Sequence, residues 1–562
     1  MIMKLKTIFL VCLSILMIFV STSCGEAIET APEKQPGGFT EEGSQGLSYQ
    51  FDSQGKYYTV TGIGTCTDKA IVIPKTHAGY PVKAIADGAF QVGKEADLSI
   101  RDSMILLSAD STATPPVHLT DKDPSNVDKD GNLIKIESVE IPDSITEIGD
   151  SAFAGCESLE DIEMTNLVNM IGTDAFKDTA FYNDPDNWEN GALYLKNHLV
   201  EVKRDFAGVL TVKEGTKHIA ASALKDCTGL SAVEFPESIA TIGACAFMGC
   251  TALTSIDLAF AGIDIGERAF YGCTALVSVK IADDSVPSTL PQVDLDKIAK
   301  LSFPESNDDT IFVDLVFSFS RNYFTYGGED FVYSAVIGKS AFAGCSALTD
   351  VVIGKNLKAI GSRAFSECTA LKTISLENLT VVSDIRDAIV HQSGMKFEKT
   401  ELSYVFSGCT SLESVTLPEG ILTLDSTFTD CTALKSVTLP STVTTLRRTF
   451  EWCSSLEGVS LPDGLMTISH AAFRGCIAMK SMTLPDSVTA ICDNAFAGLP
   501  TSCEISLGDA VQSIGAGAFE NCQTLTFRGM SEKWQAISRA DGWYTNENNT
   551  ITVHCTNGDV TE

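Results

Sequence analysis

Cysteine is the residue type whose number and spacing first suggest chemistry, because thiols form disulfides, bind metals and act as nucleophiles. Of the 18 cysteines, eleven occupy one repeated position, three residues after a Phe or Leu. These eleven are Cys156, Cys227, Cys250, Cys273, Cys345, Cys368, Cys409, Cys431, Cys453, Cys476 and Cys522. A disulfide framework would pair different positions, and no Cys-x-x-Cys pair or nearby His completes a zinc site. The spacing favours a row of buried thiols over disulfides or a metal site.

The remaining catalytic signatures are missing from the sequence. None of the seven histidines lies in a His-Glu-x-x-His pattern, and the sequence has no Gly-x-Ser-x-Gly motif and no phosphate-binding Gly-rich loop. Acidic residues are too numerous for a glycosidase pair to be recognised by counting. We therefore expect a protein that is not an enzyme and that uses no cofactor.

One acidic segment has the spacing of a calcium-binding loop. Asn126, Asp128, Asp130 and Glu137 take positions 1, 3, 5 and 12 of such a loop, with Gly131 at position 6. Position 1 is Asn, however, and no helical pattern flanks the segment. A solvated acidic turn is the favoured interpretation, with calcium binding as the alternative.

The N-terminus has the pattern of an export signal. Lys4 and Lys6 precede an apolar run over residues 7–20, which is shorter than the ~20 residues that a membrane-spanning helix needs. The small residues before Cys24 resemble a bacterial lipobox, in which the cysteine becomes a lipid anchor. The sequence thus predicts an exported protein held at the bacterial cell surface, on the outer membrane, by lipid on Cys24. An ordinary cleaved signal is the alternative.

The composition excludes some partners. Forty Lys and Arg stand against 73 Asp and Glu, which gives a formal charge of −33, while 44% of the residues are hydrophobic. Binding to nucleic acid or to anionic lipid needs clustered positive charge. We therefore expect a globular protein with no nucleic-acid partner, whose contact with membrane is through the lipid anchor only.

The body of the chain is one unit repeated many times. A Phe in a small-residue context recurs, with steps of 22 or 23 residues in uninterrupted stretches. These positions are Phe153, Phe176, Phe247, Phe270, Phe342, Phe365, Phe406, Phe428, Phe450, Phe473, Phe496 and Phe519. Many units also carry a short alternating apolar run that ends in Pro, such as Val-x-Leu-Pro, and several carry an Ile-Gly pair. Such periodicity predicts a solenoid, because one unit cannot bury its apolar side chains alone.

Each repeated position predicts a local structure. The Val-x-Leu alternation predicts a short parallel strand with two apolar side chains on one face. The Gly after Ile suggests a tight turn with positive φ. The Ala-Phe pair suggests the start of a brief helical turn, with Phe filling the space between coils. The fold class is therefore a solenoid with short parallel strands on one face and turns and short helical segments on the other.

The pattern Phe-x-Gly-Cys-x-x-Leu-x-x-Val-x-Leu-Pro, followed by Ile-Gly-x-x-Ala-Phe, resembles the BspA-like, or treponemal-type, leucine-rich repeats of ~23 residues. The resemblance covers nearly all of residues 47–555 apart from insertions. It implies terminal caps and a role in adhesion to host or matrix proteins or to other cells.

These patterns divide the chain into eight parts. They are a signal peptide (1–23), a flexible tether (24–46), an N-terminal cap and first repeat (47–90), an insertion (91–135), a solenoid (136–281), an aromatic-rich insertion (282–335), a second stretch of solenoid (336–525) and a C-terminal cap (526–562).

Two surfaces are candidate binding sites. In the aromatic-rich insertion, Tyr323, Phe324 and Tyr326 precede a Gly-Gly pair, which predicts a β-hairpin. The hairpin either packs its aromatics on the solenoid, which is favoured, or presents them to a ligand. On the Val-x-Leu strands, the outward positions are acidic in the N-terminal half and Ser or Thr in the C-terminal half; the latter are Ser414, Thr416, Ser436, Thr438, Ser460, Ser481 and Thr483. Small hydroxyl residues suit parallel strands, and they can also hydrogen-bond an extended partner.

Taken together, the sequence predicts a non-catalytic binding or adhesion protein that presents an extended sheet to a protein partner. The second hypothesis is a glycan-binding lipoprotein of a carbohydrate-uptake system. Exposed Trp or Tyr clustered along the sheet would favour glycan binding, and the Val-x-Leu strands contain few.

Overall fold

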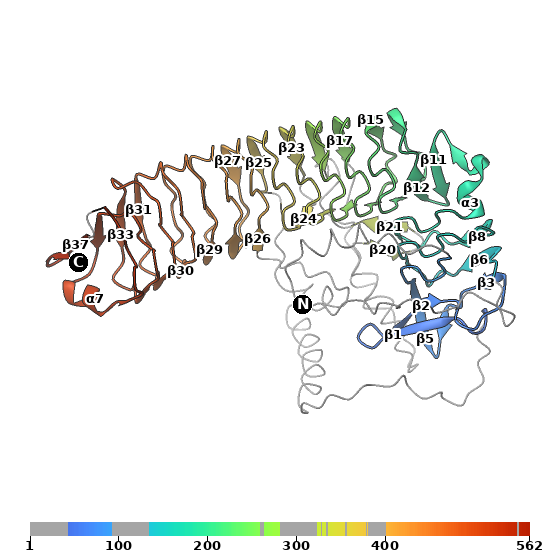
Figure 1. The fold of residues 1–562 in the computed structure, drawn as a ribbon, viewed down its shortest axis with the longest axis horizontal. Helices are drawn as coiled ribbons and strands as arrows, with labels where there is room; N and C mark the ends of the chain where they lie inside the picture. The colour runs from blue at the N-terminus through green and yellow to red at the C-terminus, as the bar shows by residue number, and fades with distance from the viewer. Residues whose placement is uncertain are drawn as a thin grey trace. The chain divides into compact units, whose positions relative to one another are not determined.

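The computed structural model describes residues 43–92, 134–258, 263–281, 323–326, 329–332, 335–354, 357–377, 379, 401–547 and 550–562. Over these ranges the chain winds into successive coils, and each coil contributes short strands to parallel sheets (Figure 1). One hydrophobic core extends from Leu47 to Val553 through all of them. The predicted parallel solenoid with a continuous apolar interior is thus confirmed.

The Val-x-Leu runs form the first set of strands, which we name the Val-x-Leu strands. In β17, Ile256 and Leu258 are buried while Ser255 and Asp257 are exposed, so one face of each strand lies on the core. The set comprises β3 (Ala70–Val72), β6 (Ser138–Ile141), β8 (Asp161–Met164), β13 (Ala207–Thr211), β15 (Gly229–Glu234), β17 (Ser255–Leu258), β19 (Ser278–Ile281), β23 (Asp350–Ile353), β25 (Thr373–Ser375), β27 (Ser414–Thr416), β31 (Ser481–Thr483), β33 (Glu504–Leu507), β35 (Thr524–Phe527) and β37 (Thr552–Cys555).

A second set of strands, which we name the Ile strands, ends at or near the Ile of each Ile-Gly position. They pair in parallel from coil to coil, as in Ile219 with Ile242 and Ile242 with Ile265. The set comprises β5 (Tyr80–Ile85), β7 (Glu147–Ile148), β9 (Met170–Ile171), β12 (His198–Val202), β14 (His218–Ile219), β16 (Thr241–Ile242), β18 (Asp264–Ile265), β22 (Ala335–Ile337), β24 (Leu357–Ile360), β26 (Glu401–Ser403), β28 (Thr423–Asp425), β29 (Thr445–Arg447), β30 (Thr467–Ile468), β32 (Ala490–Ile491), β34 (Ser513–Ile514) and β36 (Ser538–Arg539).

The glycine after each Ile has a different role from the one expected. Gly243 and its equivalents do not have positive φ, so the predicted turn geometry is wrong. Instead, a Cβ at Gly243 would lie 2.6 Å from the backbone nitrogen of Ala221 and 2.7 Å from the carbonyl carbon of Ala220 in the preceding coil. Glycine is needed here because two coils approach too closely for any side chain.

The segment around each Phe is a pair of hydrogen-bonded turns, and the expected helical segments are not found in these coils. Two residues per coil have left-handed φ, one two residues before the Phe and one two residues after it, as in Ser151 and Gly155 on either side of Phe153. The turns also bond from coil to coil, since the amide of Phe153 donates to the carbonyl of Ala175 at 2.8 Å. A helix would satisfy its amides internally and would remove these contacts.

The phenylalanines form a stacked row through the core. From Phe247 to Phe519, ten rings follow one another with centroids 4.9–6.1 Å apart and interplanar angles of 3–17°. Phe270 and Phe342 are neighbours in this row at 5.1 Å although 72 residues separate them. Burial of each ring contributes on the order of 2 kcal/mol, so the row is a main source of stability.

The cysteine column lies beside the Phe row as free thiols. In the Cys431 coil, Sγ lies 3.1 Å from the carbonyl oxygen of Phe406 in the preceding coil, and the thiol donates to it. Equivalent contacts of 3.0–3.2 Å are made by Cys156, Cys250, Cys273, Cys345, Cys368, Cys409, Cys453 and Cys476. The predicted row of buried thiols is confirmed, and the thiols also link each coil to the one before it.

Consecutive coils stay in register where the sequence departs from the repeat. β18 pairs with β22 and β19 with β23, although residues 282–334 separate them in sequence. Within that segment, β20 (Tyr323–Tyr326) and β21 (Glu329–Val332) pair antiparallel, which confirms the predicted hairpin. The connecting Gly-Gly pair lies outside the described residues.

Other elements complete the described chain. They are β1 (Ser48–Asp52), β2 (Tyr57–Gly62), β4 (Thr76–His77), α3 (Ala180–Asn183), η2 (Pro185–Asn187), β10 (Trp188–Glu189), β11 (Ala192–Leu195), α7 (Ser531–Ala536) and β38 (Gly558–Thr561). At the N-terminal end β1 pairs antiparallel with β2, and at the C-terminal end β38 pairs antiparallel with β37. Trp534 of α7 is fully buried. Their role as terminal caps stays a prediction.

The close approach at the Ile-Gly position predicts a specific sensitivity to a single methyl group. We expect Gly243→Ala to lower the free energy of unfolding by about 1–3 kcal/mol, because the backbone of the preceding coil must shift to admit the Cβ. Gly458→Ala is the matched control, since no atom lies within 4 Å of a Cβ at that position. Urea unfolding followed by circular dichroism measures both, and equal stability of the two variants would contradict the packing argument.

The thiol row predicts selective chemical labelling. Among the described cysteines, Cys492 and Cys555 are partly exposed and fourteen are buried. Burial raises the pKa of the Cys156, Cys345 and Cys409 thiols to about 12, and the thiolate is the reactive form. At pH 8 we expect iodoacetamide to label Cys492 and Cys555 in the native protein and the buried column only after denaturation, as read by peptide mass spectrometry. Rapid native labelling of the column would contradict the burial.

Candidate functional site

Three consecutive coils differ from the others by one residue. In residues 402–406, 424–428 and 446–450 the buried strand residue and the Phe are four positions apart. In the flanking coils, residues 360–365 and 468–473, they are five apart. The shortened coils therefore lack the position that is Gly361 in the preceding coil and Ser469 in the following one.

Side chains occupy the place of the glycine in the shortened coils. The Ile strands β26, β28 and β29 are each three residues long here, and their last residues pair in register as Ser403 with Asp425 and Asp425 with Arg447. Because neighbouring strands lie about 4.8 Å apart, directly paired side chains meet. The shortened coils therefore place polar and charged groups side by side on the Ile strands.

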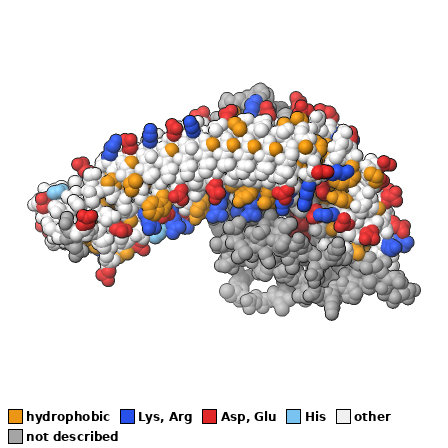
Figure 2. Space-filling view, turned by 45° about the horizontal axis from the view of Figure 1, so that its top comes forward, with side chains coloured by type: hydrophobic (Ala, Val, Ile, Leu, Met, Phe, Trp, Pro, Cys, Tyr) orange, Lys and Arg blue, Asp and Glu red, His pale blue; other side chains and the backbone are white. Residues whose placement is uncertain are grey.

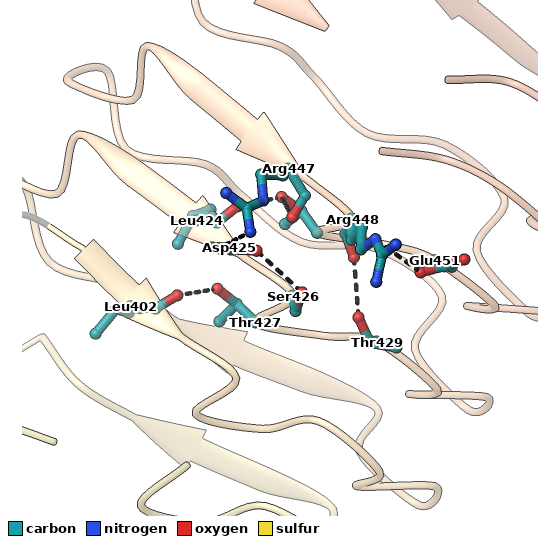
Figure 3. Close-up of polar contacts among 10 residues, drawn as sticks. Leu402, Leu424, Asp425, Ser426, Thr427, Thr429, Arg447, Arg448 and Glu451 are labelled. Atoms are coloured by element: carbon teal, nitrogen blue, oxygen red, sulfur yellow. Dashed lines mark hydrogen bonds and ion pairs between the residues drawn. The ribbon is translucent and has the colours of Figure 1, made fainter. Parts of the chain in front are cut away.

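Asp425 and Arg447 form an ion pair that joins two coils (Figure 3). The Arg447 Nη2 and Asp425 Oδ2 atoms are 3.2 Å apart, and the carboxylate side chain is only 10% exposed while that of Arg447 is 60% exposed. The Ser426 hydroxyl donates to the other carboxylate oxygen at 3.0 Å. The buried carboxylate thus holds a guanidinium whose outer face is open to solvent.

Two buried threonines in the same coils each form a hydrogen bond to the backbone of the preceding coil. Thr427 and Thr449 replace the Ala that precedes Phe in most coils, and both are fully buried. The Thr449 hydroxyl donates to the carbonyl of Leu424 at 2.5 Å, and that of Thr427 donates to the carbonyl of Leu402 (Figure 3). A buried hydroxyl with a partner is tolerated, whereas an unpaired one would destabilise the fold.

A second buried carboxylate holds two further arginines. Glu451, whose side chain is 11% exposed, lies 3.9 Å from Nε of Arg448 and 3.4 Å from Nη1 of Arg474. The side chains of Arg448 and Arg474 are 47% and 44% exposed. Figure 3 shows Arg448 directed towards Glu451, with its carbonyl accepting from the Thr429 hydroxyl at 2.9 Å. Carboxylate contacts restrict these long side chains.

Trp452 stands out on the same surface because of its backbone. It has φ of +64° at a position where seven other coils have Gly, and a bulky residue in this conformation is rare and strained. Its indole is 46% exposed, packs against Gly475 and has the Arg474 guanidinium 5.3 Å from its ring centroid. Five other coils also have a non-Gly residue with positive φ at this position, and Trp452 is the bulkiest of these residues.

These residues form one surface, which we name the guanidinium patch: Arg447, Arg448, Trp452 and Arg474. The two carboxylates within it are about nine-tenths buried, so the groups presented to solvent are three guanidiniums and one indole. Arg, Trp and Tyr are the residue types that contribute most to binding at interfaces. The patch can bind anionic groups through paired N–H donors and an apolar or planar group on the indole.

The Ser and Thr residues predicted as a binding face lie on the solvent side of the Val-x-Leu runs. Ser414 and Thr416 are on β27 and Ser481 and Thr483 on β31, whereas the runs of Ser436, Thr438 and Ser460 are joined by a single parallel bridge between Thr438 and Ser460. Ser414, Thr416, Ser436, Thr438, Ser460, Ser481 and Thr483 are all exposed. With β17, β23 and β27 turned towards the reader, Figure 2 shows charged side chains along the margins of a band of mainly uncharged atoms. This face is separate from the guanidinium patch, and a binding role for it stays a prediction.

The remaining predicted site residues are placed only in part. Tyr323, Phe324 and Tyr326 lie on β20 of the hairpin. Of the calcium-loop candidates, Glu137 is described and its carboxylate is 2.8 Å from Nζ of Lys69. Asn126, Asp128, Asp130 and the anchor candidate Cys24 lie outside the described residues, and the structure does not test them.

A shallow cavity of about 420 Å³ lies further along the Ile strands. Its lining includes His470, Cys492, Asp493 and Arg539. Burial, followed by the Asp493 charge, raises the pKa of the Cys492 thiol, and Arg539 is engaged with Glu562 at 3.1 Å. A nucleophilic cysteine needs a lowered pKa, so the arrangement does not activate Cys492 for catalysis.

A pair of histidines is buried in the N-terminal half. His198 on β12 and His218 on β14 are in register, with ring centroids 4.7 Å apart. The His218 Nδ1 and Thr241 Oγ1 atoms form a hydrogen bond of 2.9 Å. Burial, and next the neighbouring His218, lowers the pKa of His198 to about 3. This pair is a structural feature of the core, without access to solvent.

Sequence reasoning missed the guanidinium patch, although a signal was present. The steps Phe406–Phe428 and Phe428–Phe450 are 22 residues while the following steps are 23. That shortening, together with Arg447-Arg448 in place of Gly, marks the site. The Val-x-Leu alternation instead predicted a binding face on the Val-x-Leu strands, which are on a different sheet from the patch.

The stacked coils and their buried Phe, Cys and Leu rows define a leucine-rich-repeat solenoid. A profile described as "BspA type Leucine rich repeat region" matches residues 131–184, 209–312, 335–449, 402–526 and 446–553. These segments together cover more than half of the chain, so the protein belongs to the BspA type leucine-rich repeat family, as the residue pattern indicated.

Solved structures of bacterial leucine-rich repeat proteins are similar to this chain. One from Bacteroides ovatus is 20% identical, with a TM-score of 0.37 over 91% of this chain and 100% of that one. A leucine-rich cell surface protein from Faecalibacterium prausnitzii is 20% identical, with a TM-score of 0.27 over 89% and 98%. A leucine-rich repeat protein of T. pallidum is 17% identical, with a TM-score of 0.20 over 65% and 100%. No curated protein matches the chain.

In the described part of the chain, no helix combines the length and the apolar character that crossing a bilayer requires.

The buried histidine pair predicts a loss of stability in acid. The pKa of His198 in the folded protein, about 3, lies below the ~6.5 of an unfolded chain. The stability that neutral His198 contributes is therefore complete above about pH 6.5 and is lost as the pH falls towards 3. Between pH 7 and 4.5 we expect wild type to lose about 2–3 kcal/mol more than His198→Leu.

The measurement is urea unfolding at both pH values. His554→Gln is the control, because the His554 side chain is 51% exposed, and it should follow wild type. Parallel pH curves for wild type and His198→Leu would show that His198 is not the titrating group.

Proposed function

We propose that the protein is a non-catalytic binding protein of the bacterial cell surface, and that it engages a protein partner through its solenoid surface. Support comes first from the fold. Coils that share one core present long, regular rows of exposed side chains, and repeat proteins commonly use such surfaces for binding.

The observation that carries the proposal is the guanidinium patch. Three exposed arginines are held by buried carboxylates, and a Trp is exposed at the expense of backbone strain. Neither feature is needed for packing, since other coils do without them. Exposed Arg and Trp held in fixed positions are typical of the centre of a protein–protein interface.

Glycan binding is the second candidate, and one observation favours it. The exposed Trp452 indole offers a flat apolar surface on which a sugar ring can stack, and the Val-x-Leu strands offer rows of hydroxyl groups. A single exposed Trp with no deep cleft beside it is a weaker arrangement for sugars than for a protein surface. We therefore rank the protein partner first.

Display at the surface completes the proposal. The apolar N-terminal run and Cys24 favour export and lipid anchoring in the outer membrane, with residues 24–46 as a tether. The similar leucine-rich protein of Faecalibacterium prausnitzii is a cell surface protein. Adhesion to host, matrix or other cells is the role that such a display would serve.

Arrays of proteins and glycans, probed with the purified chain, test the proposal. We expect saturable binding to one or a few proteins with submicromolar to micromolar affinity, as is usual for specific surfaces of this kind. Saturable binding to glycans alone would transfer the function to the second candidate. Turnover of any arrayed compound would contradict a non-catalytic role.

A further inference from the structure

The charges around the guanidinium patch set limits on what it can bind. The chain as a whole carries −33, yet the patch presents the exposed side chains of Arg447, Arg448 and Arg474, whose carboxylate partners Asp425 and Glu451 are largely buried. The neighbouring coils are acidic on both sides, with exposed Asp430 before the patch and exposed Asp493 after it. The patch is therefore a short positive island in a negative surface.

The length of this island follows from the coil spacing. Its residues come from two consecutive coils, and the ion pair to Asp425 reaches a third. At about 4.8 Å per coil, the island extends on the order of 10 Å along the stack. A long polyanion would continue over Asp430 or Asp493 and be repelled, because exposed like charges at short range cost free energy. A short anionic segment fits within the island.

The chemistry of the groups also favours carboxylates. Each guanidinium already meets a carboxylate on its inner side, and its remaining N–H donors face solvent in the planar fork that pairs with a second carboxylate. The Trp452 indole, backed by Arg474 at 5.3 Å, supplies an apolar surface next to those donors. A peptide that alternates acidic and apolar side chains matches both features.

We propose that the guanidinium patch is the docking site for a short acidic segment, with two or three Asp or Glu residues, of a protein partner. The segment lies across the ends of β28 and β29, its carboxylates pair with Arg447, Arg448 and Arg474, and an apolar group covers Trp452. This inference rests on the proposed binding function and specifies its site and the partner's chemistry.

A labelled hexaglutamate peptide tests the site on the purified full-length chain by fluorescence anisotropy. Binding is expected to be saturable at 20 mM salt and to weaken severalfold at 150 mM, because exposed charges are screened. Arg447→Gln/Arg448→Gln should weaken it at least tenfold. Lys435→Gln/Lys480→Gln is the matched control, since it removes the same charge beside the Val-x-Leu strands, and it should bind within twofold of wild type.

Three results would overturn the inference. They are an absence of peptide binding, an equal loss in both double variants, and tighter binding of polygalacturonate than of hexaglutamate per carboxylate. The last would show that the patch serves a glycan. Arg447→Gln removes the ion-pair partner of the largely buried Asp425, so circular dichroism and urea unfolding of each variant check that the fold is retained; each variant leaves the buried Thr residues in place.

Trp452→Gly separates a binding role from a structural one. Glycine takes positive φ without strain, so the unfolding midpoint should be retained or raised while the affinity for a Glu-Leu-Glu-Leu-Glu peptide falls severalfold. Lower stability with unchanged affinity would show that the indole serves packing.

The proposed function and this inference can fail separately. If the arrays identify a protein whose binding survives Arg447→Gln/Arg448→Gln, the inference is wrong and the function stands. If the chain binds only glycans on the arrays, the proposed protein-binding function is wrong, whether or not hexaglutamate binds to the patch.

Discussion

The close approach of one coil to the next is the constraint on which the structure depends. Each coil bonds to its neighbour at the Val-x-Leu strands, at the Ile strands and at the turns around Phe, so its backbone polar groups are satisfied by its neighbours. The same approach leaves no room for a side chain after Ile in coils such as that of Gly243, and it aligns Phe and Cys in rows. The repeated residues are thus consequences of one spacing rather than independent choices.

Much of the fold could be predicted because the same residue pattern recurs many times in the sequence. A Phe, a Cys three residues later and a Val-x-Leu run recur often enough to predict parallel coils and buried thiols, and both are found. The role of the glycine and the second set of strands were not predicted. Both depend on distances between coils. The sequence alone does not distinguish a glycine that is needed for close packing from one that is needed for positive φ in a turn.

The candidate site was missed for a related physical reason. Sequence reasoning looked for polar residues on the strand with the clearest alternation, which led to Thr416 and Thr438, whereas the guanidinium patch arises where the repeat loses one residue. The position of the Arg447 side chain depends on its pairing with Asp425, which is 22 residues away in sequence, and the exposure of Trp452 depends on its backbone angle. None of these is visible in a local pattern.

The contact between Phe270 and Phe342 has a consequence for how such a chain can change. Two coils that stack directly while 72 residues separate their rings show that the connection between them can grow without disturbing the rows on either side. Lengthening a closed connection costs little entropy, about 0.6 kcal/mol for each doubling. The solenoid can therefore accept inserted segments between coils, during evolution or by engineering, while the coils on either side keep their alignment.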